Sequence, residues 1–238
     1  MVIKGCDDSL NNDSLRVLGT LLKQQSWVKA ESVQVIEKAR VPVIKFISNK
    51  NIPVDLTFID AYSRTVNSGT LAKDMFQRFM KDFPEFRYLT LLLKQFLRHH
   101  ALNNPYKGGL GSYCLMLMVM SFLQLYGKKE DGEEHNLGSL LMNFLQLFGK
   151  CFEYERVVIH VDGRQYPYRS YHIPILERFA SSLRIIDPFN PAHCIHTTFM
   201  ISKIQEALME FYTNPQSIIK TLHETMLQEE ENSPVGAL

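Results

Sequence analysis

The stretch LLLKQFLRHHALNNPYKGGLGSYCLMLMVMSFLQLYG, residues 91–127, decides the fold of this chain. Its pattern predicts a basic amphipathic helix, a glycine loop and a strongly apolar helix. Lys94 and Arg98 are four residues apart, so they project from one face of the first helix. Ser112 and Tyr113 lie at the N-terminus of the second helix, where free N–H groups and the helix dipole favour an anion. Together these residues predict a site that holds a triphosphate.

Each of these four residues also has a purely structural interpretation. Lys94 and Arg98, if they stood alone, would be ordinary residues of a solvated helix face. Ser112 would be a helix cap and Tyr113 a core aromatic. The two cations together with the neighbouring glycines favour the anion site over these alternatives.

The composition is that of an ordinary globular chain. Its 238 residues are 45% hydrophobic and 11% aromatic, enough for one sizeable core or two modest ones. The 26 basic and 25 acidic residues leave a net charge of +1. The overall charge is therefore not the strong positive charge that is typical of a nucleic-acid-binding protein. Four scattered cysteines without a CxxC pair favour reduced thiols. The apolar segment 113–126 is shorter than the roughly 20 residues of a membrane span, and we expect no membrane association.

The N-terminal part predicts a short strand and a helix. Val2 and Ile3 are strand-like, and Asp13 or Ser14 can cap the helix that follows. The apolar residues on one face of that helix are Leu15, Leu18 and Leu22.

Two further strands predict an antiparallel hairpin. Residues 41–47 and 52–58 flank the turn-rich sequence SNKN, and their prolines suit strand starts or edges. In the second strand, Asp55 and Leu56 point to opposite faces. Because a stable sheet normally needs three or more strands, the sheet predicted here is incomplete at its N-terminal side.

After Asn67 the sequence becomes mostly helical. The predicted helices cover residues 71–82, 86–102, 112–126, 137–152, 201–212 and 215–228. A small hairpin is predicted at residues 157–168 around the turn Asp162-Gly163, and residues 229–238 have the composition of a solvated tail. The predicted fold class is therefore α+β, with a short sheet and helix followed by a mostly helical domain.

Five segments carry a family resemblance. They are EKARVPVIKF (37–46), VDLTF (54–58), LLLKQFLRHHALNNPYKGGLGSY (91–113), NLGSLLMNFLQLFGKCFEY (136–154) and IDPFNPAHCI (186–195). Their order and spacing resemble the non-canonical poly(A) RNA polymerases of the type found as the catalytic subunit of the nuclear TRAMP complex. That family lies in the DNA polymerase β-like nucleotidyltransferase superfamily, and the resemblance covers nearly the whole chain.

The resemblance implies two domains with ATP bound in the cleft between them. Residues 1–66 match the C-terminal part of the nucleotidyltransferase palm, residues 67–228 the helical PAP-associated central domain, and residues 229–238 a disordered tail. It also implies two Mg²⁺ (or Mn²⁺) ions held by three carboxylates, which activate the RNA 3′-hydroxyl and steady the departing pyrophosphate. Asp55 matches the third carboxylate, although alone it would be a solvent-facing strand residue.

The resemblance also implies roles on the nucleotide side of the site. Lys94 and Arg98 match residues that contact the triphosphate, Ser112 matches a γ-phosphate contact, and Tyr113 matches the ring that stacks on the base. Asn67 matches a family residue near the ribose or base, although the loop that carries it is longer here.

His193 bears on the choice of base. A histidine at this place in IDPFNPAHCI is associated with uridylyl-transferring relatives, so a terminal uridylyltransferase is an alternative to a poly(A) polymerase. His193, Cys194 and His196 also superficially resemble metal ligands. Their spacing lacks the second half of a zinc finger, and we expect no zinc.

The family's first two carboxylates, a D-x-D that follows a Gly-Ser pair, are missing from this sequence. Met1 falls where that motif should just have ended, and the adjacent Asp7 and Asp8 are poor substitutes. We therefore expect an N-terminally truncated RNA 3′-end nucleotidyltransferase that has no meaningful activity as this chain. The alternative is a non-catalytic nucleotide-binding or scaffold module in RNA processing.

The resemblance further implies partners and a location. RNA 3′ ends would be the substrate, and a zinc-knuckle RNA-binding subunit and an RNA helicase would be partners. The sequence shows no RNA-recognition motif of its own, which agrees with RNA affinity supplied by a partner. Nuclear residence rests on the resemblance alone, with the cytoplasm as the alternative, and the oligomeric state stays open.

Overall fold

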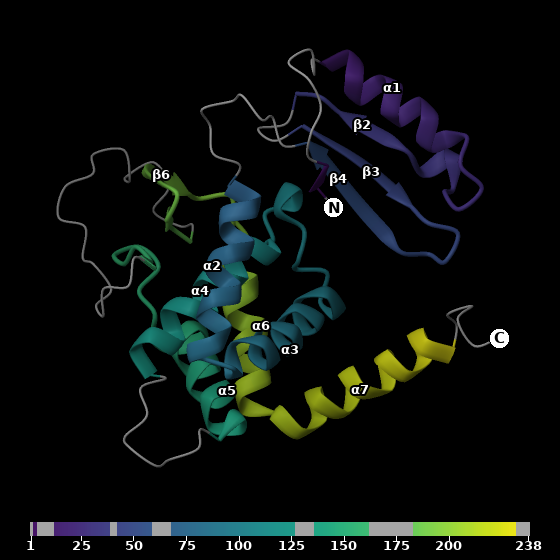
Figure 1. The fold of residues 1–238 in the computed structure, drawn as a ribbon. Coiled ribbons are helices and arrows are strands. Elements are labelled where there is room, and N and C mark those ends of the chain that lie inside the picture. Colours follow the sequence, from purple (N-terminus) through teal and green to yellow (C-terminus); the bar gives the residue numbers. More distant parts are fainter. Residues whose placement is uncertain are drawn as a thin grey trace. The chain divides into compact units, whose positions relative to one another are not determined.

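The computed structural model describes residues 2–3, 12–38, 42–58, 68–126, 136–161 and 183–231. The chain divides into two compact units, and Figure 1 labels most of their helices and strands. One unit is formed by residues 1–71 and 225–238, and the other by residues 72–224. The boundaries fall inside the helices α2 (Ser68–Asp82) and α7 (Pro215–Glu231).

The first unit contains a four-stranded sheet with the strand order β1-β4-β3-β2. Its strands are β1 (Val2–Ile3), β2 (Gln34–Ile36), β3 (Val43–Ile47) and β4 (Pro53–Phe58). The strand β3 pairs antiparallel with β2 and β4, and β1 lies parallel to β4. The predicted hairpin is confirmed, with Pro53 at the start of its strand. The sequence pattern does not indicate β2, because three residues are too few to show a period.

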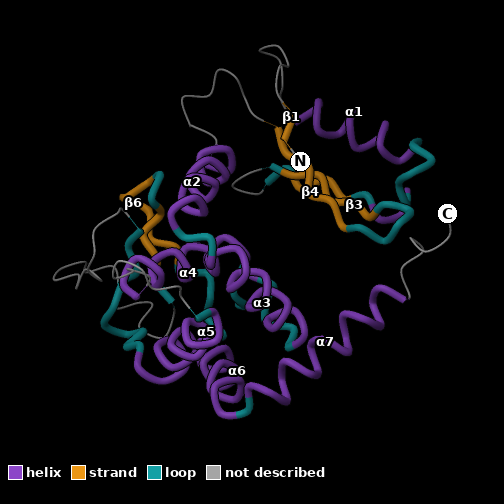
Figure 2. The backbone as a smooth tube through the Cα atoms, turned by 60° about the horizontal axis from the view of Figure 1, so that its bottom comes forward, coloured by secondary structure: helices purple, strands orange, loops and turns teal. Residues whose placement is uncertain are grey.

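The helix α1 (Asn12–Lys23) packs on this sheet, as Figures 1 and 2 show. Leu15 and Leu22 are buried on its inner face, as their spacing predicts. The other buried members of this core are Val28, Val33, Ile44, Phe46 and Leu56. The helix begins before the predicted cap at Asp13 or Ser14, so these residues lie inside its first turn.

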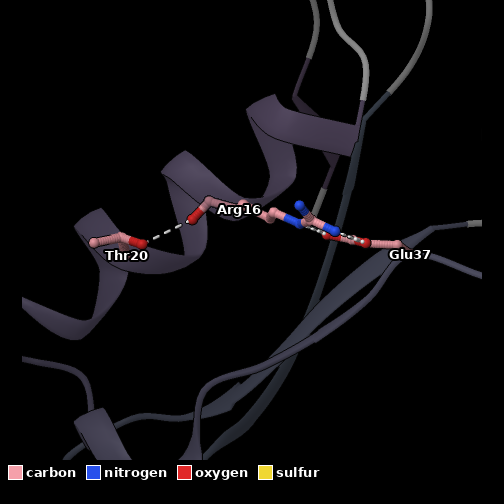
Figure 3. A network of polar contacts seen from close by, with 3 residues as sticks. All are labelled: Arg16, Thr20 and Glu37. Atoms are coloured by element: carbon pink, nitrogen blue, oxygen red, sulfur yellow. Dashed lines mark hydrogen bonds and ion pairs between the residues drawn. The ribbon is translucent and has the colours of Figure 1, made fainter.

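An ion pair ties α1 to the segment that follows β2 (Figure 3). Arg16 donates through Nε to Glu37 Oε1 at 2.5 Å and through Nη2 to Oε2 at 2.9 Å. The Oγ1 of Thr20 donates to the carbonyl oxygen of Arg16 at 3.0 Å, one turn along the helix. The hydrogen bond from Arg16 holds the pKa of the Glu37 carboxyl below its ordinary value.

The second unit is mostly helical, as Figure 1 shows, and its buried side chains form one apolar core. Besides most of α2 and α7, its helices are α3 (Glu85–His99), α4 (Ser112–Tyr126), α5 (Leu137–Gln146), the short π-helix η3 (Leu147–Cys151) and α6 (Ile201–Thr213). Each predicted helix is present. The helix predicted at residues 86–102 ends earlier because Ala101 adopts a φ of 55°, which turns the chain out of the helix.

The helix α4 is at the centre of this core. Its residues Leu117, Val119 and Phe122 have no exposed surface, because the helix is apolar on all sides and other elements cover it. In the part of the chain that the structure describes, no helix is both long and apolar enough to cross a membrane. Next to this core, η3 crosses α6 closely, since a Cβ added at Gly149 would lie 3.1 Å from the backbone nitrogen of Met209.

A second sheet, which the sequence pattern does not indicate, is an antiparallel hairpin of β5 (Ile185–Asp187) and β6 (Asn190–Ile195). Prolines at its turn and in its second strand hide the strand pattern. Ile159 forms a parallel bridge to Ile185 at the edge of this hairpin. The turn of the other predicted hairpin, residues 162–163, lies outside the described residues.

Candidate nucleotide-binding site

Two cationic side chains lie on the solvent face of α3. Lys94 and Arg98 are exposed, whereas Leu93, Phe96 and Leu97 are buried in the core. The helix is therefore anchored by its apolar face and presents its basic face to solvent, as the spacing predicts. Cations on an anchored helix can meet a phosphate group without first ordering the backbone.

The loop after α3 is fixed by its own backbone. The nitrogen of Gly109 donates to the carbonyl of Asn104 at 2.8 Å, and that of Leu110 donates to the carbonyl of Leu102 at 2.7 Å. A Cβ at Gly109 would overlap the Leu102 carbonyl, and Gly108 has a φ of 82°, a left-handed conformation that favours glycine. The loop therefore needs both glycines in order to lead the chain into α4.

The first turn of α4 is open to an anion. Ser112 is the first residue of the helix and is exposed. The first turn carries no acidic side chain. The positive end of the helix dipole therefore favours an anion here, although the Asp187 carboxylate, which accepts a hydrogen bond from Tyr113, adds negative charge close by.

Tyr113 is held from two sides. Its hydroxyl donates to Asp187 Oδ1 at 3.3 Å, and its ring meets Phe76 edge-on with 6.2 Å between the ring centroids. Asp187 is only 4% exposed and also accepts a hydrogen bond from the nitrogen of Phe189 at 3.0 Å, which closes the turn between β5 and β6. The ring of Tyr113 is half-buried against the core, so it has both a structural contact and a surface that a ligand can reach.

Asp187 is the residue of this site to which the sequence pattern assigns no role. The signal in the sequence is an Asp followed by Pro-Phe-Asn, which is typical of a turn closed by an aspartate side chain. That signal indicates the turn and not the contact with Tyr113, because the two residues are 74 positions apart and only the fold brings them together.

The strand β6 carries His193, whose side chain is half-buried. Near it, the Nδ1 of His196 lies 2.9 Å from the carbonyl oxygen of Cys194, and burial raises the pKa of the Cys194 thiol. Within the described ranges, no three His, Cys, Asp or Glu side chains gather where they could hold a metal ion.

Asp55 belongs to the first unit. It lies on β4 with an exposed side chain, whereas its neighbour Leu56 is buried, as the strand alternation predicts. Lys45, its cross-strand partner on β3, places Nζ 2.8 Å from Asp55 Oδ2. The predicted site residues on α3, α4 and β6 belong to the second unit. Asn67 lies outside the described residues, as do Asp7 and Asp8.

Known proteins resemble this chain in sequence. The family described as Cid1 family poly A polymerase matches residues 136–193. Poly(A) RNA polymerase protein 1 of Eremothecium gossypii is 34% identical over 223 residues, which cover 87% of this chain and 34% of that protein. The Inactive non-canonical poly(A) RNA polymerase protein Trf4-2 of Drosophila melanogaster is 38% identical over 154 residues, which cover 63% of this chain and 37% of that protein. The chain thus spans about a third of the length of these curated relatives.

The fold gives the same result. The solved structure described as the polymerase core of TRAMP, a RNA surveillance complex, matches with a TM-score of 0.74 at 28% identity. The match covers 93% of this chain and 68% of the solved one, and it confirms the predicted α+β fold class. By sequence and by fold, the chain belongs to the non-canonical poly(A) RNA polymerase family of nucleotidyltransferases.

Proposed function

We propose that this chain is the nucleotide-holding part of a template-independent RNA 3′-end nucleotidyltransferase that uses ATP. The observation that carries the proposal is the start of α4, where Tyr113 is anchored by Asp187 next to the exposed Ser112. In this proposal Ser112 contacts the γ-phosphate and Tyr113 stacks on the base. Lys94 and Arg98 neutralise charge on the phosphates.

The same proposal assigns the domains. Residues 1–66 form part of the nucleotidyltransferase palm, residues 67–228 form the central domain, and residues 229–238 form a tail whose first three residues continue α7. The division of the chain near Leu71 and the separate apolar cores of the two units support the boundary between palm and central domain. The second division, at Thr225, lies inside α7 and before the proposed end of the central domain.

The described residues do not fit a complete pair of metal ions. Two Mg²⁺ or Mn²⁺ ions need several oxygen ligands from the protein. Asp55 supplies one carboxylate, which is paired with Lys45, and no group of three ligands forms among the described residues. We therefore assign Asp55 one metal-ligand position and derive no metal-assisted step.

A non-catalytic role is the second candidate for this polypeptide. The printed sequence contains no D-x-D motif, and a relative at 38% identity carries the word inactive in its name. We therefore propose that the 238-residue chain binds nucleotide without extending RNA. Extension of an RNA primer by the purified chain with ATP and Mg²⁺ would refute this.

Nucleotide binding is tested by titrating the chain with a fluorescent ATP analogue. We expect the double substitution Lys94→Ala, Arg98→Ala to weaken binding by about tenfold or more, because two phosphate partners are lost. The control is Lys81→Ala, which removes an exposed cation from α2 and should leave the affinity unchanged. Equal affinities for the double variant and the wild type would overturn the assignment of these two residues.

The base preference is proposed to depend on His193. If the half-buried side chain of His193 on β6 contacts the base, His193→Ala should change the ratio of UTP affinity to ATP affinity. If His193 does not contact the base, the substitution should leave that ratio unchanged. Competition of unlabelled UTP and ATP against the fluorescent analogue measures this ratio.

Partners and location complete the proposal. RNA 3′ ends are the proposed substrate, and a zinc-knuckle RNA-binding subunit and an RNA helicase are the proposed partners, in the nucleus. The similarity to a polymerase core from an RNA surveillance complex supports this. Co-purification of tagged full-length protein from nuclear extract tests it, and an assembly without either partner class would count against it.

A further inference from the structure

Two large aromatic side chains are exposed next to the glycine loop. Phe199, in the segment that leads into α6, is 63% exposed, and Tyr106, in the short 3-10 turn η2 (Pro105–Lys107), is 74% exposed. Aromatic rings carry a large apolar surface, and together with planar partners they gain from stacking. Two such rings beside the loop that leads to Ser112 are therefore a candidate binding surface.

The backbone fixes Phe199 in place. A Cβ added at Gly108 would overlap three carbons of the Phe199 ring, so one part of the ring lies against this glycine. On one side of Phe199, the nitrogen of Met200 donates to the carbonyl of Gly108 at 2.9 Å. On the other side, the buried Thr198 donates through Oγ1 to the carbonyl of Gly109 at 3.4 Å. The exposed part of the ring is thus presented to solvent in a defined orientation.

Tyr106 is also part of an ordered turn. Its backbone nitrogen donates to Asn104 Oδ1 at 2.9 Å, and the nitrogen of Gly108 donates to the carbonyl of Pro105 at 3.1 Å. The two aromatic residues therefore belong to segments that hydrogen bonds connect to the same glycine. A ligand that stacks on them meets a backbone that is already ordered, so less entropy is lost on binding.

The charged residues near Phe199 and Tyr106 indicate which kind of ligand this surface binds. Residues 91–126 and 188–205 contain no Asp or Glu. They supply Lys107, next to Gly108, and Lys203, in the first turn of α6, and both side chains are exposed. Single-stranded nucleic acid offers both matching groups, planar bases for the ring and phosphates for the cations. An apolar protein segment would pack on the aromatic ring but would leave the two lysines without anionic partners. An acidic protein segment would pair with the lysines but would not stack on the ring.

We propose that Phe199, with Tyr106, Lys107 and Lys203, forms a ledge on which a base of single-stranded RNA stacks. The inference rests on the proposed function, because it gives the RNA a contact on the glycine loop that leads into the nucleotide site. Every base has a flat face, so the ledge binds without sequence preference.

The test measures the affinity of the full chain for a fluorescein-labelled 15-nucleotide oligo(A) by anisotropy at fixed salt. Phe199→Ala should bind at least about fivefold more weakly, the lower limit expected for one lost stacking ring. Tyr88→Ala is the matched control, because Tyr88 is a 58% exposed aromatic on α3, away from the glycine loop in sequence, and it should bind as the wild type does. Phe199→Leu keeps an apolar side chain against Gly108 and should still lose affinity, which separates stacking from packing.

Two outcomes overturn the ledge. One is full RNA affinity in Phe199→Ala, and the other is no RNA binding by the wild type, which is also the result expected if a protein covers this surface. Titration with the fluorescent ATP analogue separates this inference from the proposed function. If the wild type binds ATP but Phe199→Ala does not change its affinity for RNA, the ledge alone is refuted. If Phe199→Ala weakens RNA binding but the wild type does not bind ATP, the nucleotide site alone is refuted.

The salt dependence gives a second readout. If Lys107 and Lys203 meet phosphates, Lys107→Gln and Lys203→Gln should each lower the slope of log affinity against log salt by about one. Lys81→Gln, on α2, should leave the slope unchanged. If neither lysine variant changes the slope of log affinity against log salt, Lys107 and Lys203 do not contact phosphates of the RNA.

Discussion

At the residue scale, the hydroxyl of Tyr113 makes a contact that can be tested separately from its ring. Tyr113→Phe keeps the ring but removes the 3.3 Å hydrogen bond to Asp187, a buried carboxylate. We expect a loss of about 1 kcal/mol in the free energy of unfolding, because Asp187 keeps only part of its hydrogen bonding. Urea unfolding measures this, with Tyr88→Phe as an exposed control within about 0.5 kcal/mol of wild type. An unchanged stability would show that this bond contributes nothing.

The described thiols are expected to differ in reactivity. Cys114 is buried, and burial raises the pKa of its thiol to about 11, whereas Cys151 is exposed. The thiolate is the reactive form, so at pH 8 Cys114 should be alkylated by iodoacetamide at least about tenfold more slowly than Cys151. Peptide mass spectrometry over time measures both rates. Urea should remove the difference, and similar rates in the folded protein would contradict the buried position of Cys114.

At the scale of elements, the Arg16–Glu37 pair between α1 and the segment after β2 predicts a pH dependence. The hydrogen bond from Arg16 lowers the pKa of Glu37 in the folded state, below the ordinary 4.5. A carboxyl whose pKa is lower when folded stabilises the fold above its unfolded pKa, and this contribution is lost as the pH falls through the folded pKa. Wild type should therefore melt above Glu37→Gln at pH 7, and the difference should shrink below pH 4.5. A constant difference across this range would contradict the pairing.

The elements also show which patterns the sequence carries. Helices such as α3 and α6 are long enough to repeat their apolar spacing several times, so their positions follow from the sequence. The strands β2 and β5 are three residues each, and β6 contains a proline, so they show no period. Such strands form because a neighbour offers hydrogen bonds, and that neighbour is known only from the fold.

At the scale of the whole molecule, the two units have separate cores, which predicts two unfolding transitions. Trp27 is the one tryptophan of the sequence and lies in the first unit, edge-on to Phe46 at 5.6 Å between ring centroids. Most helical signal comes from the second unit. Leu56→Ala, in the smaller core, should lower the urea midpoint seen by Trp27 fluorescence, through a loss of about 2–5 kcal/mol, and leave the far-UV circular dichroism midpoint in place.

The reciprocal variant is Phe122→Ala in the larger core. It should lower the circular dichroism midpoint, through a loss of about 3–5 kcal/mol, and leave the Trp27 midpoint in place. Val17→Ala, at an exposed position of α1, is the control and should move neither midpoint. If both probes shift together in both core variants, the two units unfold as one.

The sequence by itself determined the class of fold, the long helices, the β3–β4 hairpin and the family. Each of these can be recognised from local periodicity, from the placement of glycines, or from short motifs in a fixed order. The sequence also placed Lys94 and Arg98 on one exposed helix face. Only the tertiary structure decided which distant residues meet. Two such contacts join segments that are far apart in the chain: the hydrogen bond between Tyr113 and Asp187, and the packing of the Phe199 ring against Gly108. Such contacts depend on how the apolar core folds the chain back on itself, and no local pattern encodes that path.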